Sequence, residues 1–322
     1  MPTSSPPLGL NPAQQQVLAG LMAAGETRPE FDPMLPARLV DLLEDRLAET
    51  AGRLGGDGID ITAAKTMLGQ VHQCERWFLA EQREGFTWSP KTAAGTVAHK
   101  AIELSVFCRD APAPMDLVDR AVERLIDAGG SWGPGEYLSG WAEAEVADLR
   151  SDACDRVTKF LECFPPLKPQ WRPVLESRTT VQLCDGRITL KGKVDLALGR
   201  RDGNRATVLL VDFKSGAAHR SHVDDLRYYA LLDTIRSGVP PFRVASYYLD
   251  SARWHHEDVD EDLLEAAAHR VVEGVIKLVE LTVDKRPPTM TAGTACAYCP
   301  ERNDCDGARQ WADQRAALGL DA

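Results

Sequence analysis

Three segments in the middle of the chain alternate apolar and polar residues with a period of two. They span residues 174–183, 187–198 and 207–213. This period is typical of β-strands that bury one face. A helical segment, residues 223–236, and a further strand, residues 242–249, follow them. The order predicts an α/β fold with a mixed central sheet and flanking helices.

Helical spacing of apolar residues dominates the flanks of this region. It predicts helices over residues 13–55, 61–81, 95–108, 116–128, 141–163 and 261–283. The second of these is expected to run without a break through Cys74. Residues 1–12 are rich in proline and serine, a composition typical of disordered chain.

Charge is distributed unevenly along the 322 residues, whose net charge is −11. Residues 168–220 carry eleven Lys and Arg against five Asp and Glu, which gives +6 there and −17 elsewhere. The overall charge argues against a protein that coats nucleic acid nonspecifically. The basic stretch is nevertheless the sign that a phosphate-binding surface needs.

Two carboxylates stand at the ends of apolar runs inside this stretch, in Gly192-Lys193-Val194-Asp195 and in Asp212-Phe213-Lys214. Because side chains alternate along a strand, Asp212 and Lys214 share one face. Singly, such residues are more often turn formers or surface ion pairs. Together they suit a divalent metal that activates water against a phosphodiester.

Four short motifs occur in order: Gly95-Thr96-Val97-Ala98-His99, Gly192 to Asp195, Asp212 to Gly216, and Asp225 to Tyr229. Their order and spacing resemble the PD-(D/E)XK nuclease superfamily, and more narrowly its RecB-like branch. The resemblance covers roughly residues 60–310. It implies the restriction-endonuclease-like fold, with a nuclease domain over residues 59–312, an N-terminal helical and partly disordered region over 1–58, and a tail over 313–322.

The resemblance also implies roles for the site residues. His99, Asp195 and Asp212 would hold Mg²⁺ or Mn²⁺, and the histidine nitrogen favours Mn²⁺. Lys214 would orient or deprotonate water, or neutralise charge on the phosphate. Glu176 would supply a further acid, and Tyr229 the aromatic residue of the last motif.

One motif departs from the family pattern, because Asp225 stands where a Gln is usual. A carboxylate cannot donate to a phosphate. Either Asp225 contributes to the metal site, or the DNA contact has moved to Arg227 or Arg220.

Three cysteines, Cys296, Cys299 and Cys305, lie close together in the C-terminal part of the sequence. The resemblance to nucleases of the AddB type and to CRISPR-associated RecB-like exonucleases nominates Cys74 as a fourth ligand and implies a 4Fe-4S cluster. Such a cross-link would stabilise the fold by about 4–5 kcal/mol in the loop-entropy description. Zinc is the competing occupant, and the spacing alone does not separate the two.

These features together predict a metal-dependent DNA nuclease, an exonuclease on single-stranded DNA, in DNA repair and recombination or in phage defence. The alternative is a catalytically weak DNA-binding or scaffolding subunit of a helicase–nuclease complex. A helicase partner is expected for any unwinding, because no ATPase P-loop is present. No signal peptide or membrane segment is evident, so a cytoplasmic location is expected.

Overall fold

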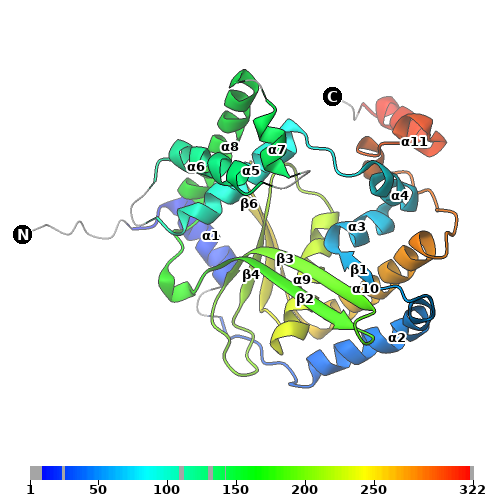
Figure 1. Ribbon diagram of the computed structural model, residues 1–322. Coiled ribbons are helices and arrows are strands. Elements are labelled where there is room, and N and C mark those ends of the chain that lie inside the picture. The colour runs from blue at the N-terminus through cyan, green and yellow to red at the C-terminus, as the bar shows by residue number, and fades with distance from the viewer. Residues whose placement is uncertain (1–8, 24–25, 109–111, 130–132, 142, 320–322) are drawn as a thin grey trace, which may run out of the picture.

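The computed structural model describes residues 9–23, 26–108, 112–129, 133–141 and 143–319 (Figure 1). Its strands are β1 (Ile61–Ala64), β2 (Val174–Leu183), β3 (Ile188–Leu198), β4 (Leu209–Lys214), β5 (Arg243–Tyr248) and β6 (Arg253–Asp258). Its α-helices are α1 (Pro12–Met22), α2 (Leu35–Asp57), α3 (Lys65–Gln73), α4 (Glu75–Glu84), α5 (Pro90–Ser105), α6 (Pro114–Asp127), α7 (Pro134–Ser139), α8 (Glu143–Cys163), α9 (Ser221–Ser237), α10 (Glu261–Thr282) and α11 (Asp306–Ala317). Three short 3₁₀ turns, η1 (Pro169–Trp171), η2 (Thr294–Ala297) and η3 (Arg302–Asp304), complete the described elements.

The six strands form one mixed sheet in which β3 is the central element. Strand β2 runs antiparallel along the length of β3, from the Val174–Ala197 pair to the Leu183–Ile188 pair. The opposite edge of β3 is shared between two partners. Strand β1 pairs in parallel with residues 188–191, and β4 pairs antiparallel with residues 196–198. Residues 192–195 belong to neither of these ladders, so the sheet opens at this point.

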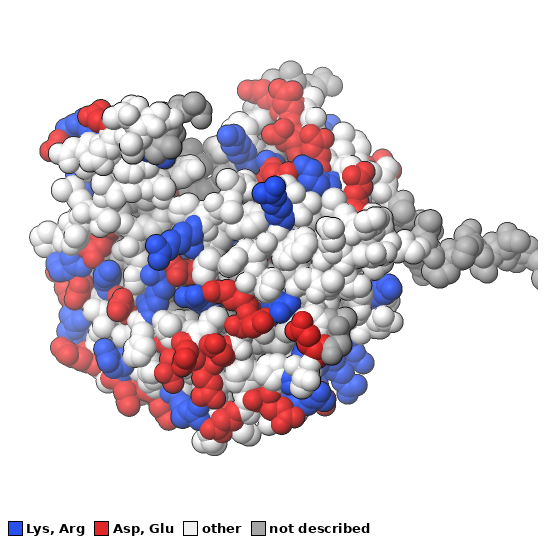
Figure 2. Space-filling view, turned by 180° about the vertical axis from the view of Figure 1, so that it is seen from behind, with Lys and Arg blue, Asp and Glu red and all other residues white. Residues whose placement is uncertain are grey.

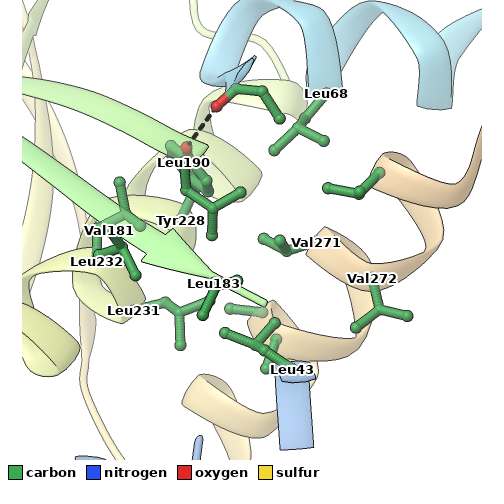
Figure 3. Packing of buried hydrophobic residues seen from close by; sticks show 14 of the residues in the cluster. Leu43, Leu68, Val181, Leu183, Leu190, Tyr228, Leu231, Leu232, Val271 and Val272 are labelled. Atoms are coloured by element: carbon green, nitrogen blue, oxygen red, sulfur yellow. Dashed lines mark hydrogen bonds between the residues drawn. The ribbon is translucent and has the colours of Figure 1, made fainter. Parts of the chain in front are cut away.

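Helices cover both faces of the sheet and enclose two hydrophobic cores. Helices α1, α5, α6 and α8 pack on one face, and α2, α3, α9 and α10 pack on the other (Figure 1). Leu43, Leu231 and Val271 show how α2, α9 and α10 meet in the second core (Figure 3). The prediction of an α/β fold with a mixed sheet is therefore confirmed.

The predicted helix over residues 61–81 is wrong at both its start and its middle. Residues 61–64 form β1, and Cys74 has extended backbone angles (φ −162°, ψ 117°) that separate α3 from α4. The Ala-rich start favours a helix locally, but its backbone groups find partners in β3. The Tyr228 hydroxyl also donates to the Ala63 carbonyl, at 3.3 Å, as drawn in Figure 3. Helix α7 and strand β6 were not predicted.

The region before residue 58 contributes to the fold through α2. Leu35, Leu39, Leu43 and Leu47 follow one face of this helix, and each is at most 1% exposed in the core shared with α9 and α10. The expected division at residue 58 falls between α2 and β1 and stays a prediction. Parts of the two predicted end regions, residues 1–8 and 320–322, lie outside the described residues. No helix in the described ranges is long and apolar enough to cross a bilayer.

We expect Leu47→Ala to lower the free energy of unfolding by about 2–5 kcal/mol, because it opens a cavity in a fully buried site. Urea denaturation followed by circular dichroism measures this change. Leu318→Ala, at a side chain that is 72% exposed, is the control and should change the free energy by less than about 0.5 kcal/mol. A Leu47→Ala loss below about 1 kcal/mol would show that α2 docks only loosely.

Candidate active site

The candidate site lies where β3 and β4 stop pairing. Leu196 and Val211 form the pair next to the opening, and Asp195 and Asp212 are the next residues on the two strands. Both carboxylates are buried, at 7% and 3% exposure. The backbone N–H of Phe213 donates to Asp195 Oδ2 at 2.7 Å, which fixes this carboxylate across the gap. The register of two strands thus brings together two acids that are 17 positions apart in the chain.

His99 extends from α5 towards the two aspartates. Its Nδ1 lies 3.4 Å from Asp195 Oδ1, and its ring meets the Phe213 ring edge-on. Burial opposes protonation, but the carboxylates of Asp195, Asp212 and Glu176 outweigh it and raise the pKa of His99. The imidazole therefore faces an anionic site.

Helix α5 approaches this closely because Gly95 lacks a side chain. A Cβ at Gly95 would lie 2.6 Å from the Ser215 hydroxyl, in the segment that follows β4. Ser89 and Thr92 form a capping box at the start of the helix, and Pro90 occupies its first turn. The Gly and His of the first motif therefore have separate tasks in packing and in the site.

Two lysines lie within ion-pair distance of the carboxylates of Asp212 and Asp225. Lys214 Nζ lies 2.7 Å from both Asp212 Oδ2 and Asp225 Oδ2. Lys65, the first residue of α3, lies 3.4 Å from Asp225 Oδ2 and 4.0 Å from Asp212 Oδ1. Burial alone would lower the pKa of each lysine, but the carboxylates outweigh it and raise both values. Conversely, burial would raise the pKa of Asp212, and the lysines lower it.

Glu176 faces the site from β2. It lies opposite Asp195 between the Leu175–Leu196 and Ser177–Val194 pairs, with a backbone φ of +53° that is rare for a residue with a side chain. Its carboxylate forms an ion pair with Lys193. Lys193 is thus held by Glu176.

Tyr229 lies beneath the site on α9. It is 4% exposed, and the Lys65 ammonium sits over its ring at 5.1 Å. Burial and the nearby Asp212 raise the pKa of Tyr229, so its hydroxyl stays protonated. Gly192 leaves room for this ring, because a Cβ there would lie 3.4 Å from it and 2.8 Å from Leu232.

A comparison with models of known protein families identifies the family. The family model described as the PD-(D/E)XK nuclease superfamily matches residues 63–306, about three quarters of the chain. The chain belongs to the PD-(D/E)XK nuclease superfamily. A comparison with curated proteins finds no significant match.

Two solved structures resemble this superfamily member at low sequence identity. One is named "Putative exonuclease", from Eubacterium rectale, with 13% identity, a TM-score of 0.42, and coverage of 77% of this chain and 86% of that one. The other is SSO0001, with 14% identity, a TM-score of 0.36, and coverage of 83% and 95% respectively.

The donor set of the site suits a hard divalent cation, although the described side chains do not form a closed cage. No three His, Cys, Asp or Glu side chains in the described ranges are grouped as a metal site. The lysines account for this, since they lie against the oxygens of Asp212. Asp212 Oδ2 touches Lys214 without hydrogen-bond geometry, so a buried oxygen keeps an unused lone pair. The carboxylates of Asp195 and Asp212 and the imidazole of His99 are ligand types that fit Mg²⁺ or Mn²⁺.

The four cysteines predicted as cluster ligands meet in space. Cys74, Cys296, Cys299 and Cys305 all line one cavity of about 280 Å³ beside Trp77. Burial and the three neighbouring thiols raise the pKa of Cys299 to about 11. None of the four forms a disulfide. They share this cavity, but no three His, Cys, Asp or Glu side chains of the described residues are arranged so that they could hold a metal ion.

The segment around these cysteines is also held by an ion pair. Glu75, the first residue of α4, is 6% exposed. Its two carboxylate oxygens accept from Arg286 Nη1 and Nη2, both at 3.0 Å. The backbone N–H of Thr289 also donates to Glu75, at 2.8 Å. The start of α4 is therefore tied to the C-terminal segment by protein groups alone.

A cavity of about 550 Å³ lies between the segment that follows β4 and the C-terminal segment. Its walls come from α4, the start of α5, α8, the segment after β4 and the C-terminal segment; they include Trp77, Lys91, Arg156, His219, His222 and Tyr298. His219 Nε2 lies 2.9 Å from the Thr294 hydroxyl, which joins two of the walls. Burial and Lys214 lower the pKa of His222 to about 4, so it lines the cavity as a neutral ring.

Several cations of the basic stretch are engaged in ion pairs. Ion pairs hold Arg187 to Asp60 and Arg201 to Asp233, besides the Lys193 pair. On the face shown in Figure 2, acidic and basic side chains are interspersed.

Sequence reasoning missed two groups around the site. Lys65 lies in an Ala-rich segment with no motif of its own. Asp250, after β5, accepts the backbone N–H of Gly216 and pairs with Arg156 at 2.7 Å, and so anchors the segment after Lys214. A strand predicted at residues 61–64 would have indicated Lys65, because it places the next residue at the opening of the sheet.

We expect Asp250→Asn to destabilise the protein by about 1 kcal/mol at pH 7, since solvent screens this partly exposed pair. Burial would raise the pKa of Asp250, but bonds from Gly216 and Arg156 outweigh it and lower the value below 3.8. A lowered folded-state pKa stabilises above the unfolded pKa, and the effect is lost as the pH falls through the folded value.

Thermal unfolding from pH 3 to pH 7 measures this effect. The difference in Tm between wild type and Asp250→Asn should be constant above about pH 4 and shrink below it. Asp148→Asn, at an exposed position of α8, is the control. A difference that is equal at pH 3 and pH 7 would contradict the assignment.

Proposed function

We propose that the protein is a metal-dependent deoxyribonuclease that hydrolyses phosphodiester bonds. The observation that carries this proposal is the convergence of Asp195, Asp212, His99 and Lys214 at the opening of the sheet. Membership of the PD-(D/E)XK nuclease superfamily supports it independently. Acids, an imidazole and an ammonium in one buried site suit hydrolysis of an anionic ester.

Each of these residues has a task in the proposed reaction. His99, Asp195 and Asp212 would hold Mg²⁺ or Mn²⁺, which supplies charge stabilisation and a more acidic water when bound. Lys214 would leave Asp212 for the phosphate and stabilise charge on it as the bond breaks. Glu176 is placed opposite Asp195 to accept a hydrogen bond from an attacking water. Tyr229 supports the site from below.

Single-stranded DNA is the substrate that the neighbouring cavity favours. Trp77 and the 75%-exposed Tyr298 offer aromatic surfaces for unpaired bases. Lys91 supplies a cation for the backbone, and Lys214 ends β4, just before the segment that lines this cavity. We infer an exonuclease of DNA repair and recombination or phage defence, working with a helicase that unwinds its substrate.

We further propose that Cys74, Cys296, Cys299 and Cys305 hold a 4Fe-4S cluster. Their common cavity supports a four-thiolate ligand set, and the resemblance to RecB-like nucleases favours iron over zinc. The cluster would be structural, because it would join α3 and α4 to the C-terminal segment.

We expect Asp195→Asn and Asp212→Asn each to lower the rate of metal-dependent cleavage by at least about a hundredfold. The loss of an anionic ligand should remove about 3 kcal/mol or more of transition-state stabilisation. Digestion of end-labelled single-stranded DNA with Mg²⁺ or Mn²⁺ measures the rate. Asp202→Asn, at an exposed position of the same basic stretch, should cleave like wild type. Wild-type protein that binds DNA but cleaves none with either metal would favour the scaffolding subunit instead.

Anaerobic purification should yield brown protein with absorbance near 400 nm and about four irons per chain. Cys299→Ser should lose colour and iron, whereas Cys154→Ser, in α8, should keep both. Stoichiometric zinc with no iron, bound through the same cysteines, would replace the cluster by a structural zinc site.

A further inference from the structure

Lys65 lies in the site but has no role in the proposed reaction. It lies on a different element from Lys214, yet both ammonium groups contact Asp225 Oδ2, at 3.4 Å and 2.7 Å. Lys65 also approaches Asp212 Oδ1 at 4.0 Å. One carboxylate outside the predicted metal set is thus shared by two cations.

The fold fixes where Lys65 stands. Ala64 pairs with Lys191 in the β1–β3 ladder, and α3 begins at the next residue. This puts the Lys65 stem at the gap left by residues 192–195 of β3. The ring of Tyr229 lies under its ammonium at 5.1 Å, while 24% of the side chain remains exposed. The Lys65 side chain is therefore held in the site without being fully enclosed.

Arg227, a cation on the same helix as Asp225, is already engaged. Arg227 makes two hydrogen bonds to Glu257 on β6, at 2.9 Å and 2.6 Å. Asp225, on the same helix, faces the lysines. The donor that this region can offer to a phosphate is therefore Lys65 rather than Arg227.

The charges of the site support the same assignment. Asp195, Asp212 and Asp225 against Lys65 and Lys214 leave one net negative charge, with His99 set aside. A bound divalent cation would turn this into one positive charge, which a single phosphodiester charge would neutralise. Once a cation takes the oxygens of Asp212, both lysines keep only Asp225 as a partner.

We propose that Lys65 is a second phosphate-binding lysine of the active site and that Asp225 positions it together with Lys214. This inference rests on the proposed nuclease function. On binding of the strand, the Lys65 ammonium leaves Asp212 and donates to a non-bridging phosphate oxygen. Asp225 keeps the two ammonium groups from repelling each other in the absence of DNA.

The test is binding of a fluorescein-labelled single-stranded DNA oligonucleotide in Ca²⁺, followed by anisotropy over a range of salt concentrations. Lys65→Met should weaken binding about tenfold and reduce the slope of log K against log salt by about 0.7, the value for one lost phosphate contact. Lys65→Arg should keep the slope. Lys277→Met, on α10, is the control, since Lys277 forms no ion pair with these carboxylates among the described residues.

Asp225→Asn separates positioning from contact. It should keep the salt slope of wild type, because both cations remain, but lower kcat in Mn²⁺ about tenfold. An unchanged slope in Lys65→Met would overturn the proposal, and so would an unchanged kcat in Asp225→Asn. If wild-type protein binds DNA but does not cleave it, the nuclease function fails while the binding test of Lys65 still decides this inference.

Discussion

The site depends on a constraint of strand pairing: β3 cannot keep β4 beside it along its whole length, because β1 takes the same edge at residues 188–191. The pairing with β4 ends at Leu196 and Val211, and the next residue on each strand is an aspartate. Burial of two carboxylates at a gap in a sheet is costly unless cations or hydrogen bonds compensate. Every other feature of the site provides such compensation.

The compensation is provided by protein groups that a cation and a phosphate can replace. Lys65 and Lys214 neutralise Asp212, the Phe213 N–H satisfies Asp195, and His99 stands beside it. The same charges that stabilise the free site are the ones that the proposed metal ion and phosphate would engage. The Glu75–Arg286 pair holds the C-terminal segment in place. This segment lines both the cavity that contains the cysteines and the neighbouring cavity.

The strands, the two aspartates and Lys214 could be predicted because their signals are local. A period of two marks a strand, and an acid at the end of an apolar run marks its functional edge. Lys65 and the break at Cys74 could not, because residues 61–64 favour a helix by composition and become a strand only through pairing with β3. Asp225 departs from the family pattern, but its pairing with Lys65 follows only from the packing of α3 against α9.

The most direct test of this account is whether the opening between β3 and β4 binds a divalent cation. Titration of metal-free protein with Mn²⁺, followed by electron paramagnetic resonance, counts the bound ions. The account predicts about one tightly bound ion per chain in wild type and none at that affinity in the Asp195→Asn/Asp212→Asn double variant. Equal binding by the two proteins, or no binding by wild type, would contradict it.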